Sequence, residues 1–132
     1  MDENFQISYF HLSNTLALSG NQGEAFEWWM KLLVLMKQDE ETILTFKTAF
    51  QTSGWQGILR ERAKRFDKGD EVYFQGAAFN AQIGNPDKAF EYLEKSYEQR
   101  EVLIPYLLVD PRLDTLRDDP RFDELVRRAG LR

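Results

Sequence analysis

Apolar residues recur along most of this chain at intervals of three and four positions, which is the spacing of one face of an α-helix and not of a strand. The segments "SGN", "SGWQG" and "IGNP" interrupt the pattern and place Gly20, Gly54 and Gly84 between successive helical stretches. We therefore predict that about three-quarters of the chain is helical, that it contains no sheet, and that pairs of helices turn at these three glycines.

Two of the turns share their surrounding sequence. Residues 19–29, "SGNQGEAFEWW", match residues 83–93, "IGNPDKAFEYL", in glycine, asparagine, alanine, phenylalanine, glutamate and an aromatic residue, 64 positions apart. Asn21, with Glu24 three positions later, is expected to cap the helix that follows it. Asn85 is expected to do the same, and the proline after it suits the first helical position. The echo therefore predicts two copies of one helix-turn-helix unit.

The turn glycines are 34 and 30 residues apart, so a third unit lies between the two copies. Residues at matching places are, in the first unit, Tyr9, Leu12, Ser13, Leu16, Ala25 and Trp29; in the second, Ile43, Phe46, Phe50, Leu59 and Ala63; and in the third, Tyr73, Ala77, Asn80, Ala89 and Leu93. On these residues the chain resembles the tetratricopeptide (TPR) repeat family, whose helix-turn-helix unit repeats near 34 residues.

The resemblance is strongest from residue 72 onward. There the chain is similar to the C-terminal end of bacterial TPR regions that follow a sensor, a winged-helix, a cyclase or a Ser/Thr kinase domain. It implies an all-α, right-handed solenoid of about three helix pairs with short C-terminal capping helices. The units would span about 4–37, 39–68 and 70–99, with a cap at 101–132, in one domain over 1–132. The chain would then be the C-terminal part of a longer signalling protein.

Two Asp-Pro steps, at residues 110–111 and 119–120, stand in the C-terminal segment. An aspartate can accept hydrogen bonds from the first backbone N–H groups of a helix, and a proline fits the first helical position, so each step predicts a short helix. Gly69 and Gly130 are expected to close the helices before them in the left-handed conformation.

The "LRDDPRF" box at residues 116–122 is expected to close the solenoid. Its charged residues would form salt bridges and caps on a polar outer face, as the end of a solenoid requires; they are Arg117, Asp118, Asp119 and Arg121. The inward face would consist of Leu113, Leu116, Phe122, Leu125 and Val126.

Composition excludes several classes of partner and of site. The formal net charge is −5 and the pI about 4.9, so a nucleic acid, which needs a basic surface, is not expected. With no cysteine and one histidine, His11, the chain predicts neither a disulfide nor a His-rich metal site. No apolar run is long enough to cross a membrane, and "MDENFQ" lacks signal-peptide features. We therefore expect no membrane insertion, and a cytoplasmic protein, or a periplasmic one if its parent is membrane-anchored.

The residues that could carry chemistry favour no reaction. His11 has no Ser or Cys partner motif nearby, and the acidic clusters "QDEE" and "RDDP" lack the spacing of a calcium loop. The basic run "LRERAKR", with Arg60, Arg62, Lys64 and Arg65, is expected to form a solvated helix face. We therefore predict no enzyme, no catalytic residue, no cofactor and no metal ligand.

The helix expected from residue 22 onward is apolar almost all round. Its polar residues, Glu24, Glu27, Lys31 and Gln38, fill a narrow sector, and the rest is Trp28, Trp29, Met30, Leu32, Leu33, Val34, Leu35 and Met36. A helix of this kind is buried on more than one side. An upstream repeat, a partner or self-association would account for the surplus.

The resemblance implies that the first helix of each pair lines a concave groove. The predicted lining is Phe10, Asn14 and Leu18; Leu44, Thr48 and Gln51; and Phe74, Ala78 and Gln82. This uncharged surface favours an apolar or amphipathic helix from a partner, from the chain's own "VLIPYLLV" segment or from a second copy. The first hypothesis is a non-catalytic interaction module. The alternatives are a small-ligand sensor or enzyme in the groove, and a purely structural cap.

Overall fold

The structure is a computed structural model, and it describes residues 3–66 and 72–131. It is 79% helix, with no strand in the described part, so the all-α prediction is confirmed. The predicted cap at Gly69 lies outside the described residues. The chain divides into two compact units, residues 1–61 and 62–132. The single domain and the continuous solenoid stay predictions.

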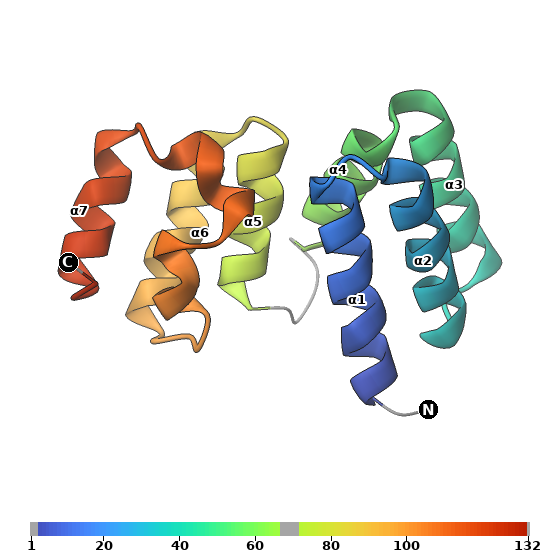
Figure 1. Cartoon of the computed structure of the whole chain (residues 1–132), viewed down its shortest axis with the longest axis horizontal. Helices are drawn as coiled ribbons and strands as arrows, with labels where there is room; N and C mark the ends of the chain where they lie inside the picture. Colours follow the sequence, from blue (N-terminus) through green and yellow to red (C-terminus); the bar gives the residue numbers. More distant parts are fainter. Residues whose placement is uncertain (1–2, 67–71, 132) are drawn as a thin grey trace. The chain divides into compact units, whose positions relative to one another are not determined.

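The first unit is built from two helix hairpins. Its helices are α1 (Glu3–Leu18), α2 (Gln22–Leu35), α3 (Glu40–Ser53) and the first part of α4 (Trp55–Phe66). In Figure 1, α1 and α2 run antiparallel side by side, and α2 also packs on α3. Ala25 is fully buried, as predicted, and Trp29 meets the ring of Phe46 edge to face at 5.3 Å. All three tryptophans of the chain lie in this unit, at positions 28, 29 and 55.

The turn between α3 and α4 is a single residue, Gly54, with φ +65° and ψ −149°. The two helices then approach each other closely at Gly57. A Cβ atom at Gly57 would stand 2.2 Å from the carbonyl oxygen of Ala49, and a backbone atom cannot easily give way. This close approach of α3 and α4 near their turn therefore requires glycine at position 57.

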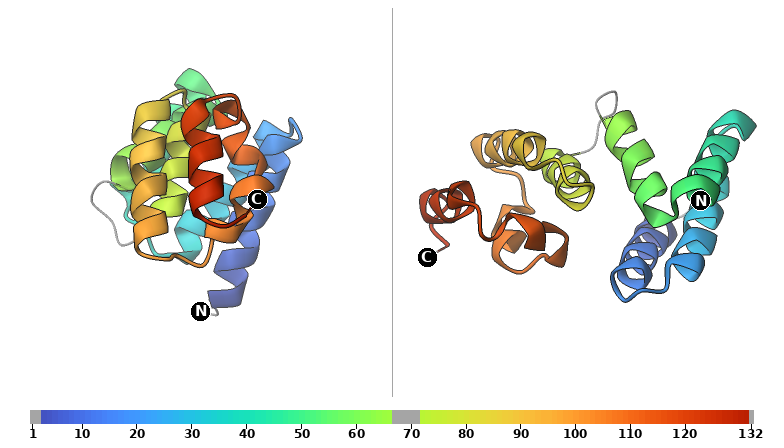
Figure 2. Two further views of the ribbon diagram at one scale, coloured as in Figure 1. Left: turned by 90° about the vertical axis from the view of Figure 1, so that its left-hand side faces the viewer. Right: turned by 90° about the horizontal axis from the view of Figure 1, so that it is seen from above.

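The second unit combines one hairpin with a capping segment. Its elements, after the end of α4, are α5 (Tyr73–Gln82), α6 (Pro86–Glu98), the 3-10 helices η1 (Ile104–Leu108) and η2 (Pro111–Leu116), and α7 (Pro120–Arg128). α5 packs on α6 and on η2, and α7 packs on α6, as the right-hand view of Figure 2 shows. The hairpin is thus covered by the chain that follows it.

The sequence echo corresponds to one backbone geometry used twice. Gly20 and Gly84 both take the left-handed conformation, with φ +90° and +80°. In both hairpins the residue after the glycine donates its backbone N–H, at 2.8 Å, to the carbonyl five residues back. This hydrogen bond closes the first helix of the pair. The predicted turns at these glycines are confirmed.

The predicted asparagine caps are wrong. Asn21 and Asn85 precede their helices, but neither side chain accepts a hydrogen bond from the helix. Each instead donates backward, Asn21 to Ser19 Oγ and Asn85 to Asn80 Oδ1, both at 3.3 Å. The reason is that each asparagine also closes the preceding helix, which sets ψ at 61° and 73°. An N-cap normally has an extended backbone.

The C-terminal caps are confirmed. Asp110 and Asp119 each accept a hydrogen bond from the backbone N–H two residues ahead, at 3.0 Å. The side chain of Arg121, and then its backbone N–H, hold the pKa of Asp119 below its usual value. The stabilisation that the charged Asp119 carboxylate provides through these hydrogen bonds is therefore present at neutral pH, and it is lost as the pH falls through the lowered pKa. The expected inward face is buried: Leu113, Leu116, Phe122, Leu125 and Val126.

A carboxylate from a distant residue caps α5. Val72 precedes the helix and has no side chain that can accept a hydrogen bond. Glu101 accepts hydrogen bonds instead from the backbone N–H of Tyr73 at 2.8 Å and of Phe74 at 3.0 Å. It also accepts one from the hydroxyl of Ser96, which is fully buried, at 2.6 Å. Glu101 thereby joins the start of α5 to the end of α6.

We expect Gly57→Ala to destabilise the protein by about 1–3 kcal/mol, because the new methyl group overlaps the Ala49 carbonyl. The free energy of unfolding is measured by urea denaturation. Gly23→Ala is the control: it lies in α2 with nothing within 4 Å of the new Cβ, and it should stabilise by roughly 0.4–1 kcal/mol. Equal unfolding curves for the two variants would contradict the close approach of α3 and α4 at Gly57.

We expect Glu101→Ala to cost about 1–3 kcal/mol, because it removes the cap of α5 and leaves the Ser96 hydroxyl without this acceptor. Thermal unfolding followed by circular dichroism measures the loss. Glu98→Ala, which changes an exposed residue at the end of α6, should stay within about 0.5 kcal/mol of the parent. A melting temperature unchanged by Glu101→Ala would show that this cap has no energetic weight.

Candidate functional site

The α5 part of the predicted groove is not an open surface. Phe74 and Ala78 are 0% exposed, and Gln82 is half-buried. The chain's own η2 packs along α5, where the hydroxyl of Thr115 donates to the carbonyl of Ala81 at 3.0 Å. Neither Phe74 nor Ala78 can therefore contact a separate molecule while the unit keeps this packing.

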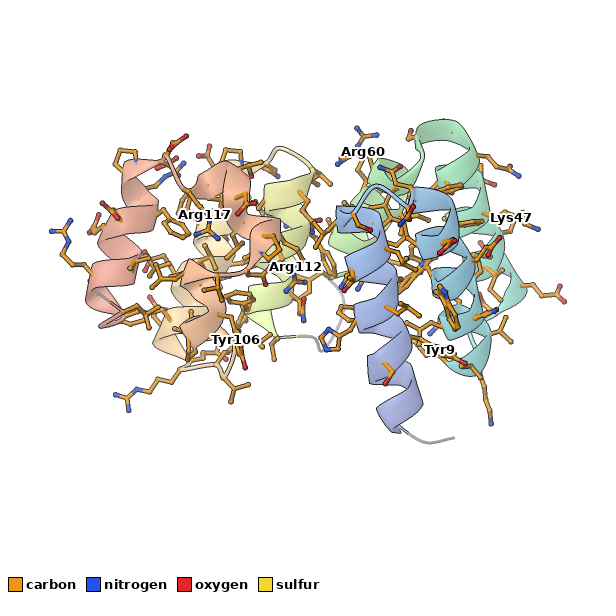
Figure 3. The ribbon with its side chains drawn as sticks, viewed as in Figure 1. Tyr9, Lys47, Arg60, Tyr106, Arg112 and Arg117 are labelled. Carbon is orange, nitrogen blue, oxygen red and sulfur yellow. The ribbon has the colours of Figure 1, made fainter. Side chains whose placement is uncertain are left out.

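Two arginines secure the segment that covers α5. Arg112 donates to Gln75 Oε1 at 2.6 Å, and Figure 3 labels it on η2. Arg117 donates to the backbone carbonyls of Leu108 at 2.7 Å and Asp110 at 3.0 Å. These hydrogen bonds confirm that Arg117 has a structural role in closing the unit. No pattern in the sequence indicated that η2 would lie on the face of α5 assigned to the groove.

The other predicted groove residues lie on the first unit. Phe10 and Asn14 of α1 are half-buried, and Leu18 is exposed. On α3, Leu44 is 61% exposed, and Thr48 and Gln51 are exposed as well. These residues thus lie on two separate helices, α1 and α3, which both pack on α2. Each of them is either half-buried or exposed.

A different apolar surface lies on α1 and α2. An open hollow of about 370 Å³ is lined by one residue of α1 and four of α2, which together we name the α2 flank: Tyr9, Met30, Lys31, Val34 and Leu35. Figure 3 shows Tyr9 on the side of α1 next to α2. Its ring lies 4.9 Å from that of Trp28, and the Lys31 ammonium stands 4.3 Å from the centre of the Trp28 ring.

The flank exists because α2 has more apolar residues than its core side needs. Ala25, Trp29, Leu32 and Leu33 are buried in the unit. Val34, on the outward side, is 63% exposed, and Met30 and Leu35 are half-buried. The prediction that α2 carries surplus apolar surface is therefore confirmed within the first unit.

The second hairpin is an internal control for the α2 flank. Tyr73 and Tyr92, 64 residues after Tyr9 and Trp28, also form a ring pair, with centres 6.0 Å apart and the rings closer to parallel. Lys95, the counterpart of Lys31, stands 5.8 Å from the Tyr92 ring. The two hairpins thus place equivalent residues in equivalent positions.

The two hairpins differ in the residues that wall the hollow. Met30, Val34 and Leu35 correspond to three polar residues of the second hairpin, Glu94, Glu98 and Gln99. Glu94 pairs with Arg128 of α7, and Glu98 and Gln99 are exposed. The same scaffold therefore carries polar residues in one copy and apolar ones in the other. Aligning the two copies position by position would have shown this difference in the sequence.

The residues with possible chemistry do not converge. No group of three or more His, Cys, Asp or Glu suited to a metal ion occurs in the described part of the chain. His11 is exposed on α1, with its ring 5.8 Å from that of Phe10. Arg62 was expected on a solvated face but is only 5% exposed, with its guanidinium 4.3 Å from the centre of the Phe79 ring. It packs there as part of the second unit, whereas Arg60, Lys64 and Arg65 are exposed.

Within residues 3–66 and 72–131, no helix has both the length and the apolar character needed to cross a membrane. Comparisons with protein-family models, with curated proteins and with solved structures give no significant match. The α2 flank is thus characterised by its own geometry and by its contrast with the second hairpin.

Neighbouring residues of α2 should respond differently to truncation. Leu33→Ala is expected to cost about 2–5 kcal/mol, because Leu33 is buried in the core. Val34→Ala, one position further along and mostly exposed, should change stability by less than about 0.5 kcal/mol. Urea denaturation of both variants measures the difference. A large loss for Val34→Ala would mean that the flank is part of the core.

Proposed function

We propose that this chain is a non-catalytic protein–protein interaction module, and that the α2 flank is its working surface. In this proposal the helix hairpins belong to a TPR-like solenoid within a larger cytoplasmic signalling protein of bacterial type. The resemblance of the sequence to bacterial TPR regions supports the solenoid and the setting, and the flank supports the interaction.

The observation that carries the proposal is the contrast between the two hairpins. The second hairpin carries polar residues at positions 94, 98 and 99, where Glu94 pairs with Arg128 of α7 and Glu98 and Gln99 are exposed, so this scaffold accepts polar residues there. Met30, Val34 and Leu35 stand at the same places in α2, where exposed apolar surface is unfavourable unless something covers it. Full burial of each such side chain supplies roughly 1.5–3 kcal/mol, offset in part by the entropy lost on association.

The test compares two substitutions of almost equal exposure in the same unit. Val34 is 63% exposed on the flank, and Leu44 is 61% exposed on α3 among the predicted groove residues. We expect Val34→Glu to lose the partners that the parent retains in quantitative affinity capture, because it places a charge in the apolar hollow. Leu44→Glu should keep them.

Circular dichroism first checks that both variants remain folded, and sedimentation velocity follows any self-association in parallel. Loss of partners with Leu44→Glu alone would move the working surface to the groove. Identical retention by the parent and Val34→Glu would refute the flank as a binding surface.

A further inference from the structure

The only sulfur atoms of this chain belong to methionine. It contains three methionines, at positions 1, 30 and 36, and no cysteine. The thioether of methionine is apolar, and a peroxide converts it to a sulfoxide, which is polar. Oxidation of a methionine therefore has a consequence for binding where its side chain forms part of an apolar surface.

Met30 forms part of such a surface, because it lines the hollow of the α2 flank. Its side chain is half-buried and the hollow is open, so an oxidant as small as hydrogen peroxide can reach it. Met36, directly after α2, is 41% exposed but stands outside the set of residues that line the hollow. Both methionines are thus accessible, and oxidation of Met30 alone places a polar group in the hollow.

The second hairpin shows that a polar side chain at this position is compatible with the fold. Glu94 is the counterpart of Met30, 64 residues later, and its carboxylate pairs with Arg128 of α7. Leu33, by contrast, is buried in the core of the first unit. A sulfoxide at Met30 should therefore change the surface of the first unit and leave its helices in place.

We propose that Met30 is a site of reversible oxidation, and that its sulfoxide prevents binding at the α2 flank. The proposal rests on the proposed function and adds a form of regulation to it. The oxidised form is disfavoured at an interface because burying the sulfoxide oxygen beside Tyr9 and Val34 removes it from water without supplying a donor from these apolar surroundings.

The chemistry balances with hydrogen peroxide as the oxidant. The sulfur attacks one peroxide oxygen, the O–O bond breaks, and an S=O bond forms; the sulfur loses two electrons, and the second oxygen leaves as water. Methionine sulfoxide reductases, one for each sulfoxide epimer, reverse the step with two thiols, which become a disulfide while the sulfoxide oxygen leaves as water.

The first experiment locates the modification. The full chain and its Met36→Leu variant are treated with hydrogen peroxide, the reaction is stopped with catalase, and mass spectrometry maps the added oxygen. We expect one oxygen on Met30 in both chains, unchanged helical circular dichroism, and its removal by the two reductases with dithiothreitol. An unmodified Met30 in a chain whose Met36 is fully oxidised would overturn the proposal, as would unfolding of the Met36→Leu chain on oxidation.

The second experiment measures the effect on binding by quantitative affinity capture, with peroxide removed before the partners are added. The oxidised parent and oxidised Met36→Leu should lose the partners that their reduced forms retain, and the reductases should restore them. Met30→Leu should keep its partners after the same treatment. Met30→Gln, which places a polar side chain of similar length in the hollow, should lose them without any oxidant, and Met36→Gln should not.

The outcomes separate this proposal from the proposed function. If Val34→Glu loses the partners while the oxidised parent and Met30→Gln retain them, the α2 flank binds but Met30 does not regulate it, and the proposal fails alone. If Val34→Glu, Met30→Gln and the oxidised parent all retain the partners, or if the reduced parent retains none, the proposed function fails as well.

Discussion

A helix hairpin cannot bury both of its apolar sides by itself, and the structure of this chain follows from how each hairpin meets that constraint. The second hairpin is covered by the segment that follows it, with η2 on α5 and α7 on α6, and by the Phe66 ring on its aromatic pair. In the first hairpin α2 packs on α3, and its Gln22 accepts a hydrogen bond from the backbone N–H of Trp55 at the start of α4. The α2 flank remains as the side of α2 for which the described part of the first unit provides no cover.

The capping segment covers the second hairpin with little α-helix. Its two 3-10 helices bury Ile104, Leu107 and Leu113, while Arg112 and Arg117 bind backbone and side-chain oxygens around them. Glu101 adds a contact of another kind, because its carboxylate caps α5 from 28 residues away. Arg100 makes this possible by taking the left-handed conformation, with φ +54°, directly after α6. The start of one helix is thus fixed by the end of the next.

Features set by neighbours in the sequence could be predicted, and features set by tertiary packing could not. The turns at Gly20 and Gly84 and the caps at Asp110 and Asp119 depend on residues within one turn, and they are confirmed. The prediction that Asn21 and Asn85 cap the helices after them was wrong because each of them also closes the helix before it. The burial of Phe74, and of Arg62 against Phe79, depends on segments distant in sequence. The surplus of apolar residues on α2 could be predicted from its composition. The contribution of Tyr9 to the hollow could not, because it depends on how α1 packs on α2.

The uneven distribution of tryptophan has a spectroscopic consequence. Trp28, Trp29 and Trp55 all belong to residues 1–61, so tryptophan emission, excited selectively over that of tyrosine, reports on the first unit, while far-ultraviolet circular dichroism sums the helices of both. Trp29 and Trp55 are buried, so their emission should shift to longer wavelength as that unit opens. The chain therefore carries a natural optical label on one half, and coincident or separate transitions in the two signals measure how far the halves unfold as one cooperative system.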